Sequence, residues 1–164
     1  MKFFGGVIVG ICLPFIGGYL FIISGGMPVA TNSKPLPFER YLAGTAIRAA
    51  IHHSVIQEPP IAPSDDNMKA GAKVYQQQCE FCHGLPNKGR DFVAKGMFPP
   101  PPQLLPPGKG VTDDPVGITY WVVSNGIRTT GMPGFQSLLT PQQIWQVSLF
   151  LKNPNLADFP AQAQ

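Results

Sequence analysis

The sequence has few metal-binding side chains and little charge. Its three cysteines and three histidines include only Cys12, His52 and His53 outside one five-residue stretch. A structural zinc site needs about four such ligands at suitable spacing, so we expect no zinc site. Twelve basic and nine acidic residues give a net charge of +3, without a basic run or an acidic tail. We therefore expect no nucleic-acid partner.

The five-residue stretch is Cys79-Glu80-Phe81-Cys82-His83. Two thiols at this spacing can add to the two vinyl groups of one haem edge, and the adjacent histidine can then bind the iron. A thioredoxin-like redox pair also has this cysteine spacing but does not need the histidine. The motif therefore predicts one covalently attached haem c, with its iron bound by His83. No disulfide framework then remains, so the fold must be stabilised by packing around the cofactor.

The N-terminal segment is apolar. Residues 3–23 are 21 positions without a charge, about 30 Å of helix, which matches the hydrocarbon thickness of a bilayer. No good cleavage site follows, so we expect a transmembrane anchor over residues 1–24, with a cleaved signal peptide as the alternative. Lys2 favours a cytoplasmic N-terminus, and c-type haem is attached outside the bacterial inner membrane. We predict a single-pass inner-membrane protein with a periplasmic haem domain, and we interpret Cys12 as a buried thiol.

Residues 25–63 are predicted to be a periplasmic tether that contains an amphipathic helix over residues 38–56. Apolar side chains recur there at helical spacing, at Tyr41, Leu42, Ile47, Ile51 and Val55. The sequence does not decide whether this apolar face packs on the haem domain, on the membrane surface or on a partner subunit. His52 and His53 are expected to be helix-surface residues rather than iron ligands.

Residues 64–158 are predicted to form the haem domain, and residues 159–164 a C-terminal tail. Start and stop signals indicate three helices. Ser64 or Asp65 caps the first, which reaches about Gln78; the second runs over residues 115–125; the third, over residues 141–152, begins with a capping box. Proline and glycine, 19 and 18 residues, exceed a fifth of the chain, which predicts long irregular connections.

A second iron ligand is predicted in the loop Gly131-Met132-Pro133-Gly134, which begins 48 residues after His83. A methionine sulfur is the other axial ligand that suits an electron-transfer haem. A lone methionine otherwise fills gaps in a core. The stiff loop favours His83 and Met132 as the pair of iron ligands. Met97 follows His83 by only 14 residues and is expected on the proximal side, not as a ligand.

These motifs make residues 65–158 resemble class I c-type cytochromes. The resemblance implies an all-α fold of about three to five helices around a covalent haem. It also implies that Gly71 and Tyr75 of the first helix cross the last helix at Phe150 and Leu151.

In that family, a proline followed two residues later by leucine lines the proximal side of the haem. Pro102-Gln103-Leu104 matches this pattern, which makes Pro102 and Leu104 cofactor-binding residues. The carbonyl of Pro102 would accept the second ring N–H of His83 and fix the orientation of the imidazole.

The resemblance implies a one-electron carrier, a membrane-anchored monohaem cytochrome c in a periplasmic or respiratory chain. We expect no enzyme activity and no small-molecule substrate, because Met132 fills the iron position that an enzyme or gas sensor leaves open. Redox proteins are the expected partners: an oxidase, a dehydrogenase or a quinol-oxidising complex. The alternative is a permanent haem c subunit of a respiratory or dehydrogenase complex. Lys88, Arg90 and Lys95 either steer an acidic partner or form a solvated loop.

Overall fold

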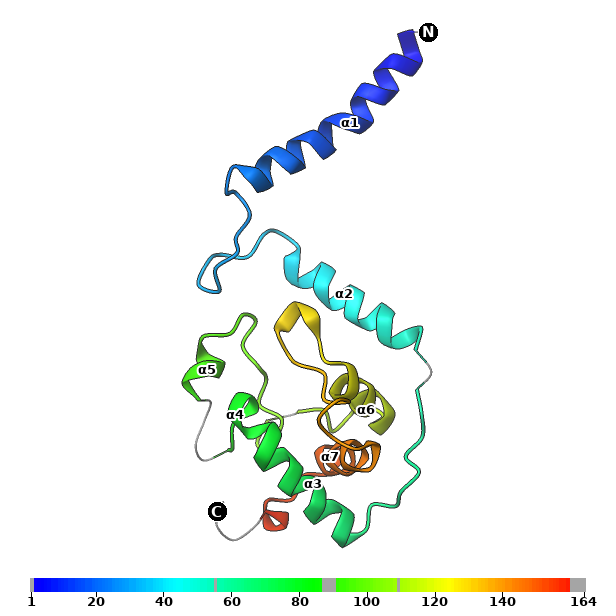
Figure 1. The fold of residues 1–164 in the computed structure, drawn as a ribbon, viewed down its shortest axis with the longest axis vertical. Coiled ribbons are helices and arrows are strands. Elements are labelled where there is room, and N and C mark those ends of the chain that lie inside the picture. The colour runs from blue at the N-terminus through cyan, green and yellow to red at the C-terminus, as the bar shows by residue number, and fades with distance from the viewer. Residues whose placement is uncertain (1, 55, 87–90, 109, 160–164) are drawn as a thin grey trace. The chain divides into compact units, whose positions relative to one another are not determined.

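The computed structural model describes residues 2–54, 56–86, 91–108 and 110–159 (Figure 1). This part of the chain is helical, contains no strand, and has one isolated bridge between Ile127 and Met132. Its helices are α1 (Lys2–Ile23), α2 (Glu39–His52), α3 (Asp65–Gln78), α4 (Glu80–His83), α5 (Phe92–Lys95), α6 (Val116–Asn125) and α7 (Pro141–Lys152), with 3₁₀ turns η1 (Arg128–Thr130) and η2 (Leu156–Asp158). The predicted all-α fold is confirmed for these residues. The chain divides into two compact units, Met1–Glu39 and Arg40–Gln164.

The first unit contains α1. The large apolar side chains that are described in this helix are exposed, for example Val9 at 57% and Phe15 at 75%. Of the helices in the described part of the chain, none has the length and apolar character needed to cross a membrane. The expected anchor is therefore not supported by the structure. The prediction of a buried Cys12 is wrong, since this thiol is exposed among exposed neighbours.

Helix α2 is shorter at both ends than the sequence predicts. Phe38 has a φ of 64°, which lies outside the helical region, so the helix begins at the next residue. At the other end, the amide of Ser54 donates to the carbonyl of Ile51 at 3.0 Å, an i to i−3 bond of the kind that tightens the last turn of a helix. The helix has no buried residue. Val55, predicted on its apolar face, lies outside the described residues.

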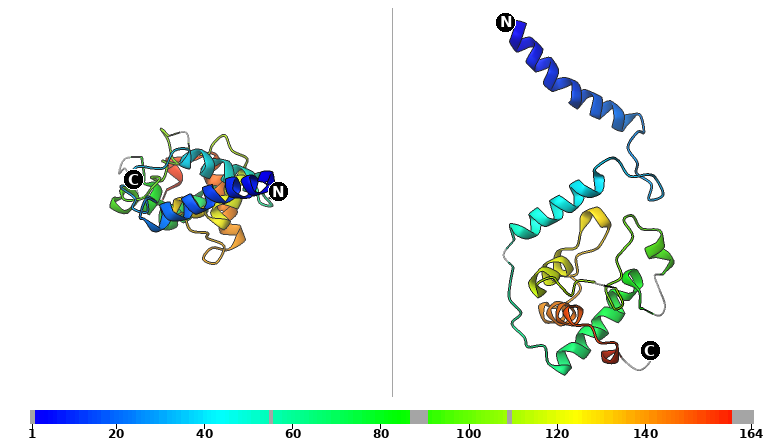
Figure 2. Two further views of the ribbon diagram at one scale, coloured as in Figure 1. Left: turned by 90° about the horizontal axis from the view of Figure 1, so that it is seen from above. Right: turned by 180° about the vertical axis from the view of Figure 1, so that it is seen from behind.

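The second unit is built on the crossing of α3 and α7, visible from opposite sides in Figures 1 and 2. Ser64 caps α3 by accepting a bond from the amide of Asn67 at 3.4 Å. Thr140 and Gln143 form the predicted capping box of α7, with Pro141 in its first turn. These local signals place both helices where the sequence predicts them.

The predicted crossing residues meet. Gly71 lies against the backbone of α7, and the rings of Tyr75 and Phe150 are 6.1 Å apart between centroids. Tyr75, Phe150 and Leu151 are almost completely buried. The helix crossing that the resemblance implied is confirmed.

Helix α6 packs on the other side of α7. Its boundaries agree with the prediction, and it ends at Gly126, which has a φ of 69°. The ring of Tyr120 stacks on that of Trp145 with centroids 4.0 Å apart. The segment after α2 touches this helix, because the backbone carbonyl of Gln57 lies against Gly117. Sequence patterns did not predict this contact.

Candidate haem-attachment site

The attachment motif forms a single helical turn at the end of α3. Cys79 ends α3 and begins α4. The amides of Cys82 and His83 donate to the carbonyl of Cys79 at 3.1 and 2.9 Å. Gly84, with a φ of 72°, then turns the chain away in a conformation that favours glycine. The two thiols and the imidazole are thus held on one short rigid turn.

The hydroxyl of Tyr75 braces this turn by donating to the carbonyl of Gly84 at 2.8 Å. The pKa of Tyr75 is raised above its usual range, first by burial and then by the neighbouring ionisable groups Cys79 and Glu80. From the sequence, we expected Tyr75 at the helix crossing only. Its hydrogen bond to Gly84 is a second role. The residue type was the signal for it, because a buried tyrosine usually has a hydrogen-bond partner for its hydroxyl.

Burial also acts on Cys79. The pKa of this thiol is raised to about 12. Burial is the larger cause, and the nearby Cys82 is the smaller. Cys79 packs against the apolar core. Its sulfur is therefore a neutral thiol at physiological pH, the protonation state whose S–H is consumed when a thioether forms.

The imidazole of His83 is oriented by Pro102. Its Nδ1 atom lies 2.8 Å from the backbone carbonyl oxygen of Pro102. A carbonyl only accepts, so Nδ1 carries the hydrogen and Nε2 has the lone pair that binds a metal. This is the contact that the resemblance implied. Leu104 belongs to the buried core, as does Leu105, which the sequence analysis missed.

The loop that contains Met132 is tied back to the end of α6. The amide of Ile127 donates to the carbonyl of Met132 at 2.9 Å, and that of Phe135 donates to the carbonyl of Val123 at 2.9 Å. Gly131 has a φ of 75°, which favours glycine immediately before the methionine. These backbone bonds and the conformation of Gly131 therefore define the path of the loop.

Several of the predicted site residues share one apolar cluster. Leu104 is buried within it, and Cys79 and Met132 pack against it from its edge. His52 and His53 are exposed, with their rings 5.6 Å apart. They lie outside this cluster.

Met97 does not lie where we expected it. Its terminal methyl carbon is 3.6 Å from the position of a Cβ on Gly131, so it touches the loop of Met132 rather than keeping to the proximal segment. In the described residues between His83 and Met97, the chain forms the short helix α5. Lys95 is exposed, whereas Lys88 and Arg90 lie outside the described residues.

The donor set fits haem c. It consists of two thiols one turn apart, an imidazole with a defined tautomer, and a thioether in a preformed loop. The described residues contain no group of three or more His, Cys, Asp or Glu side chains that would hold a metal ion by themselves. Two thiols, an imidazole and a thioether are the side chains that attach a haem and bind its iron.

Comparison with known proteins agrees with this donor set. Residues 66–151 match the family described as cytochrome C oxidase, cbb3-type, subunit III. Cytochrome c6 of Limnospira maxima is 32% identical over 85 residues, which are 52% of this chain and 90% of that protein.

Two larger proteins of Pseudomonas putida are also similar. The quinohemoprotein alcohol dehydrogenases ADH IIB and ADH-IIG are 24% and 27% identical over 102 and 139 residues, or 62% and 82% of this chain. The matches span only 13% and 18% of the two dehydrogenases. No solved structure matches the chain.

Proposed function

The chain belongs to the cbb3-type cytochrome c oxidase subunit III family and is a class I c-type cytochrome, and we propose that it works as a one-electron carrier between redox proteins. Like its family, it binds haem c covalently. The observation that carries the proposal is the rigid attachment turn, whose histidine is oriented by Pro102.

Each residue of the site has a defined role in this proposal. Cys79 and Cys82 would form the two thioether bonds, and His83 and Met132 would bind the iron. When bound, the haem supplies a reversible one-electron change at its iron. Pro102 holds the imidazole in orientation, and Leu104 excludes water from beside it. Backbone hydrogen bonds hold the turn of His83 and the loop of Met132, which would limit movement of the iron ligands during electron transfer.

The experiment that tests this function counts the haem and the electrons. We expect one haem per chain that stays attached after denaturation and acid–acetone extraction. A redox titration should follow a one-electron curve. Haem that is extracted by acid–acetone would contradict covalent attachment, and a chain that cannot be reduced reversibly would contradict electron transfer.

We further propose that residues 1–24 hold the protein at the bacterial inner membrane with its haem domain in the periplasm. The support comes from the uncharged residues 3–23 and from the exposed apolar side chains of α1. The protein should remain in the membrane fraction after a high-salt wash and require detergent for release. Release by salt alone, or an N-terminus near Ala30, would contradict this localisation.

A second candidate function is a permanent haem c subunit of an oxidase or dehydrogenase complex. It is favoured by the name of the family, which describes an oxidase subunit, and by the similarity to segments of two quinohemoprotein dehydrogenases. Purification in mild detergent separates the two candidates. A stoichiometric partner that stays bound through gel filtration would identify a subunit, whereas a chain that elutes alone would identify a shuttle.

A further inference from the structure

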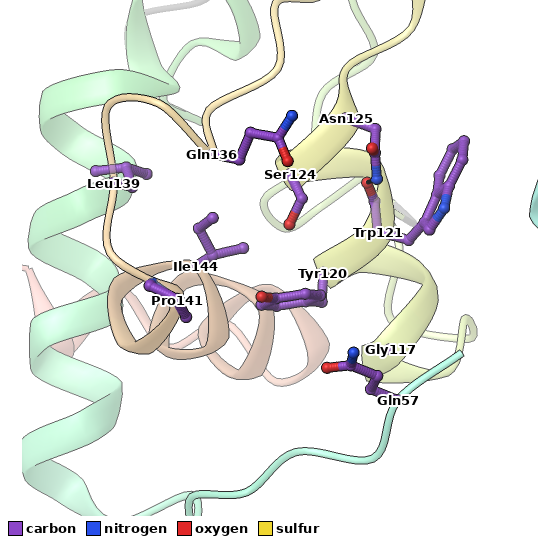
Figure 3. A pocket seen from close by; sticks show the side chains of 10 residues that line it. All are labelled: Gln57, Gly117, Tyr120, Trp121, Ser124, Asn125, Gln136, Leu139, Pro141 and Ile144. Carbon is purple, nitrogen blue, oxygen red and sulfur yellow. Dashed lines mark hydrogen bonds between the residues drawn. The ribbon is translucent and has the colours of Figure 1, made fainter. Parts of the chain in front are cut away.

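The structure contains a pocket of about 310 Å³ beside α6 and the start of α7 (Figure 3). It is formed by α6, the start of α7, the segment after the methionine loop and the chain that follows α2. Its described lining residues are Gln57, Gly117, Tyr120, Trp121, Ser124, Asn125, Gln136, Leu139, Pro141 and Ile144. This set includes none of the residues that we assign to the haem.

The hydroxyl of Ser124 points into this pocket (Figure 3). Ser124 is only 7% exposed. Among the described side chains, its Oγ is the buried polar atom that has no hydrogen-bond partner. An unpaired buried hydroxyl destabilises a fold. If this side chain contributed only to packing, alanine at this position would give a more stable protein.

Ser148 on α7 shows the contrast. It is completely buried, and its hydroxyl donates to the carbonyl of Ile144 at 2.7 Å. Both serines are buried on neighbouring helices. The hydroxyl of Ser148 has a partner in the protein, whereas the hydroxyl of Ser124, which faces the pocket, has none among the described residues. The missing partner of Ser124 is therefore expected inside the pocket.

The remaining lining specifies the chemistry of that partner. Leu139, Pro141 and Ile144 supply apolar surface, and the ring of Tyr120 is fixed by stacking on Trp145. None of the described lining residues is charged, so nothing there compensates the desolvation of an ion. The volume lies at the lower end of the range for small-molecule pockets, about 300 to 1,000 Å³, which suits a single ring.

We propose that this pocket binds an uncharged single-ring molecule that carries a hydroxyl group, a phenol in chemical class. The hydroxyl of the ligand bonds to Oγ of Ser124, and its ring lies between Tyr120 and the apolar wall at Leu139 and Ile144. The ligand is bound without being converted. This inference does not depend on the proposed electron transfer.

The test is a titration of the reduced, full-length holoprotein with phenol, followed by the backbone amide resonances of Ser124 and Gln136. Ser124→Ala should weaken phenol binding about tenfold, as expected for the loss of one hydrogen bond. The same variant should bind benzene as tightly as the wild type does. Benzoate, which is charged, should not shift these resonances.

Ser148→Ala is the matched control and should leave the affinity for phenol unchanged. Equal affinity of Ser124→Ala and wild type for phenol, or the absence of saturable shifts, would overturn the proposal. Without ligand, Ser124→Ala should raise the melting temperature, because it removes an unpaired buried hydroxyl. A lower melting temperature would mean that only a bound water fills this role, and would also overturn it.

Discussion

Gly71 of α3 lies directly against the backbone carbonyl of Gln146 in α7. A Cβ atom at this position would collide with that carbonyl and lie 2.8 Å from the Cβ of Phe150. Because a backbone carbonyl cannot move away as a flexible side chain can, the two helices approach each other this closely only over a glycine.

Gly71→Ala should therefore lower the free energy of unfolding of the holoprotein by about 1 to 3 kcal/mol, the usual range for overpacking, and Gly71→Leu by at least as much. Chemical denaturation measures this. Gly44→Ala on α2 is the control, since its Cβ would meet only the end of the Arg48 side chain, at 3.4 Å. The free energy of unfolding of Gly44→Ala should equal that of the wild type or be slightly higher. An equal loss of stability in Gly71→Ala and Gly44→Ala would refute the close helix crossing.

Tyr75→Phe should cost about 1 to 3 kcal/mol, because it leaves the buried carbonyl of Gly84 without its partner. The raised pKa of Tyr75 adds a dependence on pH. Its unfolded-state value is about 10, so the hydroxyl contributes fully below about pH 10 and progressively less as the pH rises toward the folded-state pKa.

Denaturation curves of wild type and Tyr75→Phe should therefore converge above about pH 10. Tyr41→Phe, at a side chain that is 67% exposed, should match the wild type throughout. A gap between wild type and Tyr75→Phe that widens in alkali would contradict the assignment of this hydrogen bond.

Cys79→Ala and Cys82→Ala should each lower the accumulation of folded protein several-fold. The haem domain is small, and a bound cofactor stabilises the folded state that binds it. Cys12→Ala, in α1, should accumulate normally. Haem staining together with antibody detection measures both quantities, and normal amounts of folded protein without haem would disprove the idea.

The helices of the haem domain were predictable because their ends are set by local signals. These signals are Ser64, the Thr140 capping box and Gly126. Each acts on backbone groups within four residues, so the sequence around it is enough to predict the helix end. Pro102 was chosen among four consecutive prolines only by its spacing to Leu104, and its contact with His83 is present.

Other features were not predictable because they depend on residues distant in sequence. Three such features arise only when separate segments pack together. They are the bond from Tyr75 to Gly84, the contact of Met97 with Gly131, and the unpaired hydroxyl of Ser124. The early end of α2 is marked by a bond from the amide of Ser54 to the carbonyl of Ile51, which helical periodicity does not reveal.

The most direct test of the account is the far-red sulfur-to-iron charge-transfer band of the oxidised protein in two variants. Met97 contacts Gly131, the residue immediately before Met132, which makes the two methionines a matched pair. Met132→Ala should abolish the band, lower the reduction potential and let carbon monoxide bind the reduced iron, because one axial position is then open. Met97→Ala should keep the band, since Met97 contributes packing. A band that survives in Met132→Ala and disappears in Met97→Ala would contradict the assignment of Met132 as the iron ligand.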